Sequence, residues 1–491
     1  MTTVLHRARL GLADSISSVV LEADQVARVQ DVGAPFPPGA EVLDLDGRTV
    51  LPGLWDHHVH LDQWSLVQHW VDLTGTTGPA EVVSLIRNRL RLGRPPHQLP
   101  LVGYGFRDGL WSQPPHRALL DAVTAELPLV MVGWDLHQAW LNSAALRRYA
   151  MFDPDHDGIV REDAWMPIMA DLRTVPTPVL DQWVAEAATA AAARGVVGVV
   201  DYESADNLAS WPRRTAATGL VLRVHASVWP DHLEDAIEAG LQTGDVVPGT
   251  AGLVTLGSLK VITDGSLNTR TAYCDDAYPG EPGNRGVLTV PPTELVPLMR
   301  RAWSHGITAA IHAIGDHANA LALDAFAATG ARGSIEHAQL LRPADVRRFA
   351  ELGVVASVQP EHALDDRDLA DRYWSGRTER AFPFLDLHRT GAVLALGSDA
   401  PVAPLDPWVT LAAAVSRSRD GLAPWHPEQE LDLTTALAAS TASKRVVPQA
   451  GDPADLVVVD LDLRTATAEQ LRAASVAGTL LAGRWTHRAT I

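Results

Sequence analysis

From about residue 195 onward the sequence repeats one unit, in which a short apolar run follows a glycine, ends on a polar residue and precedes an amphipathic stretch. Apolar runs of this length, alternating with helical segments, are typical of parallel strands that are covered on both faces. Seven such runs lie at residues 195–203, 221–228, 256–265, 306–316, 333–339, 353–361 and 391–399. An eighth, "LPGLWDHHVH", begins at Leu51.

Eight strand–helix units are the number that closes a (β/α)8 barrel, and we therefore predict an α/β fold of the TIM-like barrel type. An open, doubly wound sheet is the alternative, but it usually carries a glycine-rich phosphate loop after an early strand, and we find none in the sequence. Short alternating strands near both chain ends predict a small β-sandwich domain built from residues 1–50 and 450–491. The barrel then spans 51–449, with a cap-like inserted region within 61–193.

The composition is that of a globular protein with a large core, since 46% of the 491 residues are hydrophobic and 20% are charged. The formal net charge of -19 disfavours nucleic acid and acidic membrane surfaces as partners. The single cysteine, Cys274, excludes an internal disulfide and a cysteine-rich metal cluster, and it fits a reducing compartment. With no apolar segment typical of a signal peptide, we expect a cytoplasmic protein that acts on a small molecule, with a homodimer as the commonest oligomer.

Three histidines stand within four residues at the end of the first predicted strand, in "WDHHVH". Because side chains of a strand alternate between its faces, His58 and His60 project to one side and His57 to the other. Two neutral imidazoles on one face can bind a metal ion. The alternative is a pair of hydrogen-bonded histidines at a strand end.

Further side chains of the metal-ligating type lie at other predicted strands, and the active sites of such barrels lie at the carboxyl ends of the strands. They are Lys260 in the fourth strand, His312 at the end of the fifth, His337 at the end of the sixth and Asp399 at the end of the eighth. Taken singly, His312 could be a hydrogen-bonded core histidine and Asp399 a helix cap. Lys260 is harder to explain, because a buried ammonium is costly unless paired and is repelled by a nearby cation.

That repulsion disappears if the amine of Lys260 has reacted with carbon dioxide, because a carbamate is an anion whose two oxygens can bridge two metals. Four imidazoles, one carbamate and one carboxylate are nitrogen and oxygen donors of the kind that Zn2+ favours. The sequence thus predicts a divalent metal site at one end of the barrel, with Zn2+ as the most suitable ion.

The segments "PGLWDHHVHL", "SLKVITDGSLNTRTA", "IHAIGDHAN", "SIEHAQ" and "LALGSDAPVAPLDPW" resemble successive motifs of the amidohydrolase superfamily. They are most similar to its branch of exo-acting metal-dependent hydrolases, which includes the N-substituted formamide deformylases. The resemblance implies two metals per chain, with His58 and His60 on the more buried one. It implies that His312 and His337 bind the more exposed one.

The same resemblance implies that carboxylated Lys260 bridges the two metals and that Asp399 contacts the first metal and a bridging hydroxide. Two cations lower the pKa of shared water, so that hydroxide is available at neutral pH. Asp399 would then accept a proton from the attacking hydroxide and deliver it to the departing nitrogen. The implied activity is hydrolysis of a C–N bond in a small amide, formamide, carbamate or lactam.

Four residues are candidates for contact with the substrate: His137, Asp264, Arg270 and Trp111. His137 and Arg270 match positions that resemble substrate-facing residues of the branch, Asp264 follows the bridging lysine closely, and Trp111 could wall an apolar pocket. Each has a plain alternative as a residue that orders a loop or fills a core. The stretch 264–286, rich in Gly, Pro and Asp, is long enough to cover the barrel mouth as a lid.

Two other functions stay open from the sequence. A deaminase with a single metal shares the barrel, but such enzymes generally use a glutamate after the fifth-strand histidine, where this chain offers only Asp316. A single-metal site also leaves Lys260 unexplained. A non-enzymatic barrel scaffold is the third possibility, and relatives of that kind normally lose metal ligands, whereas all six candidate ligands are present here.

Overall fold

The computed structural model describes residues 2–108, 111–133, 138–161, 164–172 and 174–489. The chain divides into two compact units, one formed by residues 1–61 with 188–491 and the other by residues 62–187. The predicted insertion within 61–193 encloses the second unit. None of the described helices combines the length and apolarity of a membrane-spanning segment.

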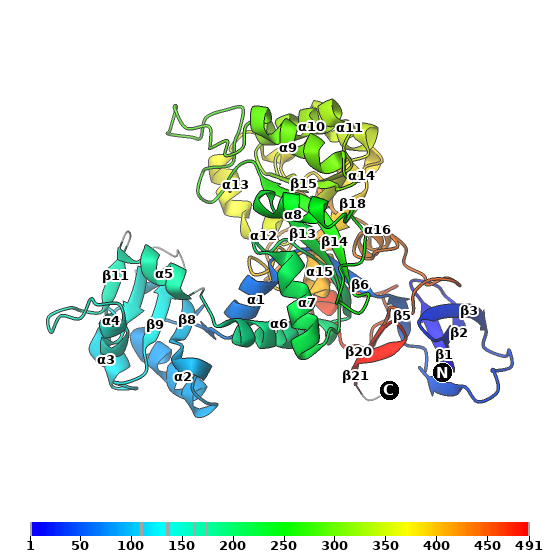
Figure 1. Ribbon diagram of the computed structural model, residues 1–491, viewed down its shortest axis with the longest axis horizontal. Coiled ribbons are helices and arrows are strands. Elements are labelled where there is room, and N and C mark those ends of the chain that lie inside the picture. The colour runs from blue at the N-terminus through cyan, green and yellow to red at the C-terminus, as the bar shows by residue number, and fades with distance from the viewer. Residues whose placement is uncertain (1, 109–110, 134–137, 162–163, 173, 490–491) are drawn as a thin grey trace. The chain divides into compact units, whose positions relative to one another are not determined.

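The larger unit contains an eight-stranded sheet in which each strand runs parallel to its neighbour (Figure 1). In spatial order the strands are β6 (Leu54–Val59), β12 (Val196–Asp201), β13 (Arg223–Val228), β14 (Val254–Ile262), β15 (Ala309–Ala313), β16 (Gly333–His337), β17 (Val355–Val358) and β18 (Leu394–Leu396). They match the eight strands expected from the apolar runs, so the predicted (β/α)8 barrel is confirmed. Their side chains are largely buried because helices cover the outer face and the barrel core fills the inner one.

The barrel closes between its first and last strands just where three candidate ligands lie. The backbone N–H of Asp399 donates to the carbonyl of His58 at 2.7 Å, and that of His60 donates to the carbonyl of Ala400 at 2.8 Å. Val59 and Ala400 form a parallel bridge. Closure therefore fixes the positions of the β6 histidines and of Asp399 relative to one another.

Gly397 makes this closure possible, because a β-carbon there would lie 2.6 Å from the backbone nitrogen of His58. We expect Gly397→Ala to lower the free energy of unfolding by about 1–3 kcal/mol, since a group forced into a packed interior displaces its neighbours. Urea denaturation followed by circular dichroism measures the loss. Gly283→Ala is the control, because nothing lies within 4 Å of a β-carbon at that position; equal stability of the two variants would contradict the prediction.

Helices link the barrel strands and cover the outside of the ring. Those between barrel strands include α7 (Asn207–Thr218), α8 (Leu233–Glu238), α9 (Pro292–Trp303), α10 (Asp316–Thr329), α11 (Pro343–Leu352), α12 (His362–Asp365), α13 (Arg367–Tyr373) and α14 (Phe384–Arg389). In the sequence, α6 (Thr177–Ala192) precedes β12, α15 (Pro407–Ser416) and α16 (Leu433–Ala439) follow β18, and α17 (Ala468–Arg472) comes later still. Helices α9, α10 and α11 pack side by side (Figure 1). Helix α11 begins at Pro343 and stops at Gly353 in the left-handed conformation, as expected for a first-turn proline and a terminal glycine.

Both chain ends contribute to a second sheet of the larger unit (Figure 1). Its strands are β1 (Thr2–Leu10), β2 (Ile16–Glu22), β3 (Gln25–Asp31), β4 (Glu41–Asp44), β5 (Thr49–Pro52), β19 (Leu456–Val459), β20 (Val476–Leu481) and β21 (Arg484–Arg488). Antiparallel pairing of β5 with β19 joins the N-terminal and C-terminal parts. The predicted small β domain built from both termini is therefore confirmed, and β5 leads directly into β6 of the barrel.

The second unit has its own sheet and its own hydrophobic cores. The sheet contains β7 (Val71–Asp72), β8 (Leu101–Phe106), β9 (Leu129–Gly133), β10 (Gln138–Leu141) and β11 (Ile159–Arg161). The helices from Leu61 to Leu172 are α1 (Leu61–Gln68), α2 (Pro79–Arg91), α3 (Arg117–Asp121), α4 (Ser143–Arg148) and α5 (Met166–Leu172). Its residues thus form a folded unit rather than a loop inserted into the barrel.

Candidate metal centre

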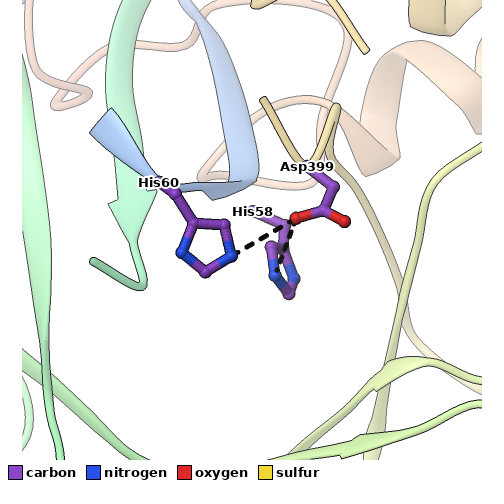
Figure 2. A group of neighbouring side chains, drawn as sticks. All are labelled: His58, His60 and Asp399. Atoms are coloured by element: carbon purple, nitrogen blue, oxygen red, sulfur yellow. Dashed lines mark ion pairs between the residues drawn. The ribbon is translucent and has the colours of Figure 1, made fainter. Parts of the chain in front are cut away.

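Three candidate ligands meet where the barrel closes (Figure 2). His58 lies near the end of β6, His60 directly follows that strand, and Asp399 follows β18. The Oδ1 atom of Asp399 lies 3.5 Å from Nε2 of His58 and 3.4 Å from Nε2 of His60. These distances are those of a group that can share one metal ion. Strand alternation therefore predicted correctly that His58 and His60 face the same side.

The other two predicted imidazoles lie next to this group. The ring centroids of His58 and His337 are 4.8 Å apart, and those of His312 and His337 are 4.5 Å apart. His337 and Asp399 both have positive φ angles, 76° and 58°. Non-glycine residues adopt such angles at a cost, and they do so most often at functional sites.

Lys260 is buried in the same part of the barrel. Its Nζ lies 4.2 Å from the ring centroid of Tyr202, and it has no hydrogen-bond partner among the described residues. Burial lowers the pKa of Lys260 to about 8, although the carboxylates of Glu336 and Asp399 favour the charged form. The neutral amine, the form that reacts with carbon dioxide, is therefore accessible near neutral pH.

Glu336 and Gln359 orient two of the imidazoles. The buried carboxylate of Glu336 accepts a hydrogen bond from Nδ1 of His58 at 2.6 Å and further ones from Tyr202 and Ser334. Oε1 of Gln359 accepts one from Nδ1 of His337 at 2.8 Å. Each contact places the proton of the imidazole on Nδ1 and leaves Nε2 with a lone pair, which is the usual arrangement around a metal-binding histidine.

Burial also sets the charges of the site. It lowers the pKa of His58 and of His337 well below the usual value, and that of His312 to about 3, so these imidazoles are neutral at pH 7. Burial disfavours ionisation of Asp399, but the hydrogen bond from His60, whose own pKa Asp399 raises, helps to hold the pKa of Asp399 well below the usual range. Neutral imidazoles and an ionised carboxylate are the forms that bind a cation.

Several polar atoms of this cluster are buried without a hydrogen-bond partner in the described part of the chain. They are Nε2 of His58, Nε2 of His312 and Nζ of Lys260. Leaving so many polar atoms unsatisfied is costly in a folded protein, and a shared cation removes that cost. The residues present therefore fit a divalent metal.

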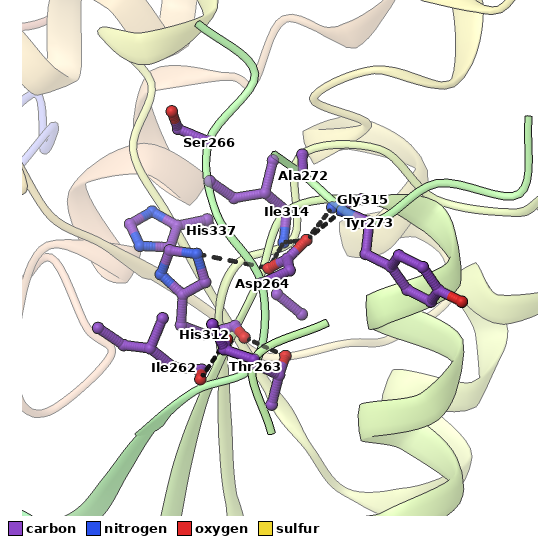
Figure 3. Close-up of polar contacts among 12 residues, drawn as sticks. Ile262, Thr263, Asp264, Ser266, Ala272, Tyr273, His312, Ile314, Gly315 and His337 are labelled. Carbon is purple, nitrogen blue, oxygen red and sulfur yellow. Dashed lines mark hydrogen bonds and ion pairs between the residues drawn. The ribbon is translucent and has the colours of Figure 1, made fainter. Parts of the chain in front are cut away.

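Asp264 lies beside this cluster, and most of its contacts order the backbone (Figure 3). Its carboxylate accepts hydrogen bonds from the backbone N–H groups of Tyr273, Ile314 and Gly315 at 2.9–3.0 Å. Its Oδ1 also lies 3.4 Å from Nε2 of His312. Burial raises the pKa of Asp264 to about 7 against the effect of the backbone bonds. These contacts match the alternative that Asp264 orders a loop.

Two of the remaining candidates for substrate contact, Arg270 and Trp111, have partners of their own. Arg270 pairs with Glu281 at 3.0 Å and donates to the hydroxyl of Tyr373 at 3.2 Å. Trp111 belongs to the unit formed by residues 62–187, where its indole donates to the carbonyl of Thr76 at 3.0 Å. His137 lies outside the described residues.

The segment 264–286, expected as a lid, is packed into the fold of the larger unit. The side chains of Leu267, Ala272, Cys274 and Tyr278 are buried in the main hydrophobic core. Burial raises the pKa of the Cys274 thiol to about 12, so this cysteine is not a nucleophile at neutral pH. These four side chains therefore belong to the core of the larger unit.

His362 is a residue of the cluster that sequence reasoning did not select. It begins helix α12 after β17, and its Nε2 lies 3.7 Å from Oδ2 of Asp399. The supporting residues Glu336 and Gln359 were also not selected. The only signal in the sequence is that the run "VQPEHALDD" places ligand-type side chains directly after an apolar strand.

A parallel eight-stranded barrel with imidazoles, a lysine and a carboxylate at the carboxyl ends of its strands defines a class, the barrel hydrolases that use divalent metals. The chain belongs to the amidohydrolase family, whose model matches residues 41–487. The predicted superfamily is thus confirmed, and membership supports a metal-dependent hydrolase.

Three relatives illustrate the similarity. The chain is 29% identical to Protein LONG AFTER FAR-RED 3 of Arabidopsis thaliana, over 82% of this chain and 75% of that protein. It is 25% identical to the N-substituted formamide deformylase of Arthrobacter pascens, over 92% and 91% of the two chains. The crystal structure of an uncharacterized metal-dependent hydrolase from Pyrococcus horikoshii OT3 is 26% identical, with a TM-score of 0.79 over 96% of this chain and 99% of that one.

Proposed function

We propose that the protein hydrolyses a C–N bond of a small molecule, an amide, formamide, carbamate or lactam, with two divalent cations. The observation that carries the proposal is the meeting of His58, His60 and Asp399 within 3.5 Å at the point of barrel closure. The similarity to an N-substituted formamide deformylase over 92% of the chain supports the choice of bond.

We assign His58 and His60 to the first cation, His312 and His337 to the second, and Asp399 to the first. Lys260, as a carbamate, would supply an oxygen to each cation; its unpartnered Nζ and lowered pKa support this role. Zn2+ suits these nitrogen and oxygen donors, although other divalent metals share the preference. When bound, such cations polarise a carbonyl group and make water acidic enough to lose a proton near neutral pH.

The side chain that moves protons in this proposal is Asp399. Its carboxylate is ionised, so it accepts a proton as water attacks the carbonyl carbon of the substrate. It then donates that proton to the departing nitrogen, because an amine leaves readily only when it is protonated. Glu336 and Gln359 keep His58 and His337 in one tautomer during this cycle.

We also propose that the partners are small molecules, without nucleic acid or membrane, that the protein works in the cytoplasm, and that a homodimer is its oligomeric form. The net charge of -19 and the single cysteine support the first two statements. Sedimentation equilibrium would measure the oligomeric state and so test the proposed homodimer.

The test of the proposed function combines metal analysis with a substrate panel. Emission spectroscopy of the purified protein should give about two equivalents of divalent metal per chain. A panel of N-formyl, N-acyl, carbamate and cyclic amide compounds should contain at least one that is hydrolysed, and a chelator should abolish that activity. One metal equivalent with release of ammonia from a heterocycle would instead favour a deaminase, and bound metal without any turnover would favour a scaffold.

A further inference from the structure

His362 contacts the candidate metal centre from helix α12, which follows β17. It is buried, with 5% of its surface exposed, and its ring stacks on that of His337 at 5.9 Å with an interplanar angle of 12°. Its Nε2 lies 3.7 Å from Oδ2 of Asp399. By distance alone, His337, His362 and Asp399 could share a metal ion.

His362 differs from His58 and His337 in the group that its Nδ1 contacts. Nδ1 of His58 and Nδ1 of His337 each face an oxygen that accepts, so their protons are on Nδ1. Nδ1 of His362 instead faces Nε2 of Gln339 at 3.4 Å. An amide nitrogen only donates, so with the amide of Gln339 in this orientation Nδ1 of His362 accepts and the proton of this ring is on Nε2.

The two oxygens of Asp399 thus have different neighbours. Oδ1 faces the two histidines of β6, and Oδ2 faces the N–H of His362. We propose that His362 is a positioning residue: its Nε2–H is directed at Oδ2 of Asp399, and it is not a further metal ligand. The proposal deepens, and for its catalytic part rests on, the proton-carrying role proposed for Asp399.

An N–H directed at Oδ2 from 3.7 Å, a little beyond hydrogen-bond distance, favours one rotation of the carboxylate about its Cβ–Cγ bond. Oδ1 then stays directed toward the β6 histidines, and Asp399 meets the attacking water and the departing nitrogen in one orientation. Holding a reacting group in one geometry removes part of the entropic barrier to the reaction. If the proton were on Nδ1 instead, the lone pair of Nε2 of His362 would face a lone pair of Oδ2 of Asp399. A cation between the two atoms would stabilise that arrangement.

The tautomer is measured directly by nuclear magnetic resonance on protein with 15N-labelled histidine, freed of metal by a chelator. His362 is assigned by the signal that disappears in His362→Gln. We expect the coupling pattern of an Nε2–H ring for His362 and of Nδ1–H rings for His58 and His337. An Nδ1–H ring at His362 would overturn the proposal. This measurement needs no substrate, so it stands even if the proposed reaction is wrong.

Substitution of His362 tests its effect on the reaction. His362→Leu should keep the metal content of the wild type while kcat falls about 10- to 100-fold, as expected when a group that orients a catalytic residue is lost. His362→Gln should recover part of kcat, since its amide supplies an N–H. KM should change less than kcat. Loss of one metal equivalent in His362→Leu, or an unchanged kcat, would overturn the proposal.

His225→Leu is the matched control for loss of a buried imidazole from the barrel. His225 lies on β13, stacks on Trp55 at 4.7 Å and contacts the hydroxyl of Thr255. Trp55 and His58 are an odd number of residues apart on β6, so their side chains project to opposite faces. We expect His225→Leu to lower the denaturation midpoint and to leave kcat per folded molecule unchanged. If His225→Leu lowered kcat as much as His362→Leu does, the loss would be a general effect of removing a buried imidazole, and the role proposed for His362 would be rejected.

Discussion

Replacing Asp399 with asparagine is expected to lower kcat/KM on the best substrate by at least about 1000-fold, because it removes several kcal/mol of transition-state stabilisation. Asparagine has nearly the shape of aspartate, and its carbonyl oxygen can still face His58 and His60. It cannot accept a proton from water or donate one to the departing nitrogen. Steady-state kinetics on a substrate identified in the panel measures the loss.

Asp345→Asn is the control for the loss of a buried carboxylate. Asp345 is 4% exposed in helix α11 and pairs with Arg348 at 2.9 Å, outside the metal centre. Its substitution should affect stability and not kcat/KM. The metal content of Asp399→Asn is measured in parallel, so that loss of a cation is told apart from loss of the proton carrier. Near-normal activity of Asp399→Asn with full metal content would reject the role assigned to this residue.

The barrel could be predicted because its strands are buried on both faces. Such strands read as short apolar runs, and "GVVGVVD" and "GAVLALGSD" both became barrel strands, β12 and β18. The polar residues at the ends of these runs could be predicted to form one site, because a parallel barrel brings the carboxyl ends of its strands together. His60 and Asp399, 339 residues apart in the sequence, therefore came within 3.4 Å.

Residues beyond the strand ends could not be placed in the same way. His362 follows β17 by four positions and reaches Asp399 because of how the chain turns into α12. Asp264 was a candidate for substrate contact, but most of its contacts are with backbone N–H groups, such as that of Ile314, whose positions depend on loop conformation. Loop conformation is set by long-range packing, and one sequence does not reveal it.

Replacing Lys260 with alanine is expected to lower kcat/KM at least about 1000-fold, because it removes an anion that holds two cations together. Formation of a carbamate joins the lysine nitrogen to the carbon of carbon dioxide and releases one proton from the nitrogen. Protein equilibrated with 13C-labelled bicarbonate should therefore show one carbamate signal in its 13C spectrum. Lys260→Ala should lack that signal, bind less metal and regain some activity when a short carboxylic acid is added.

Lys444 is a matched control, because burial lowers its pKa to about 8, the same value as that of Lys260. Basicity alone would then let both amines react with carbon dioxide. Nζ of Lys444, however, is held at 3.2 Å by Nε2 of His57 and by the carbonyl of Ala439, whereas that of Lys260 has no hydrogen bond among the described residues. A carbamate at Lys444 would also be a buried anion beside that carbonyl, while one at Lys260 would meet cations held by the neighbouring imidazoles. We therefore expect Lys444→Ala to keep the labelled signal, and a signal that disappears with Lys444 and persists without Lys260 would contradict the assignment.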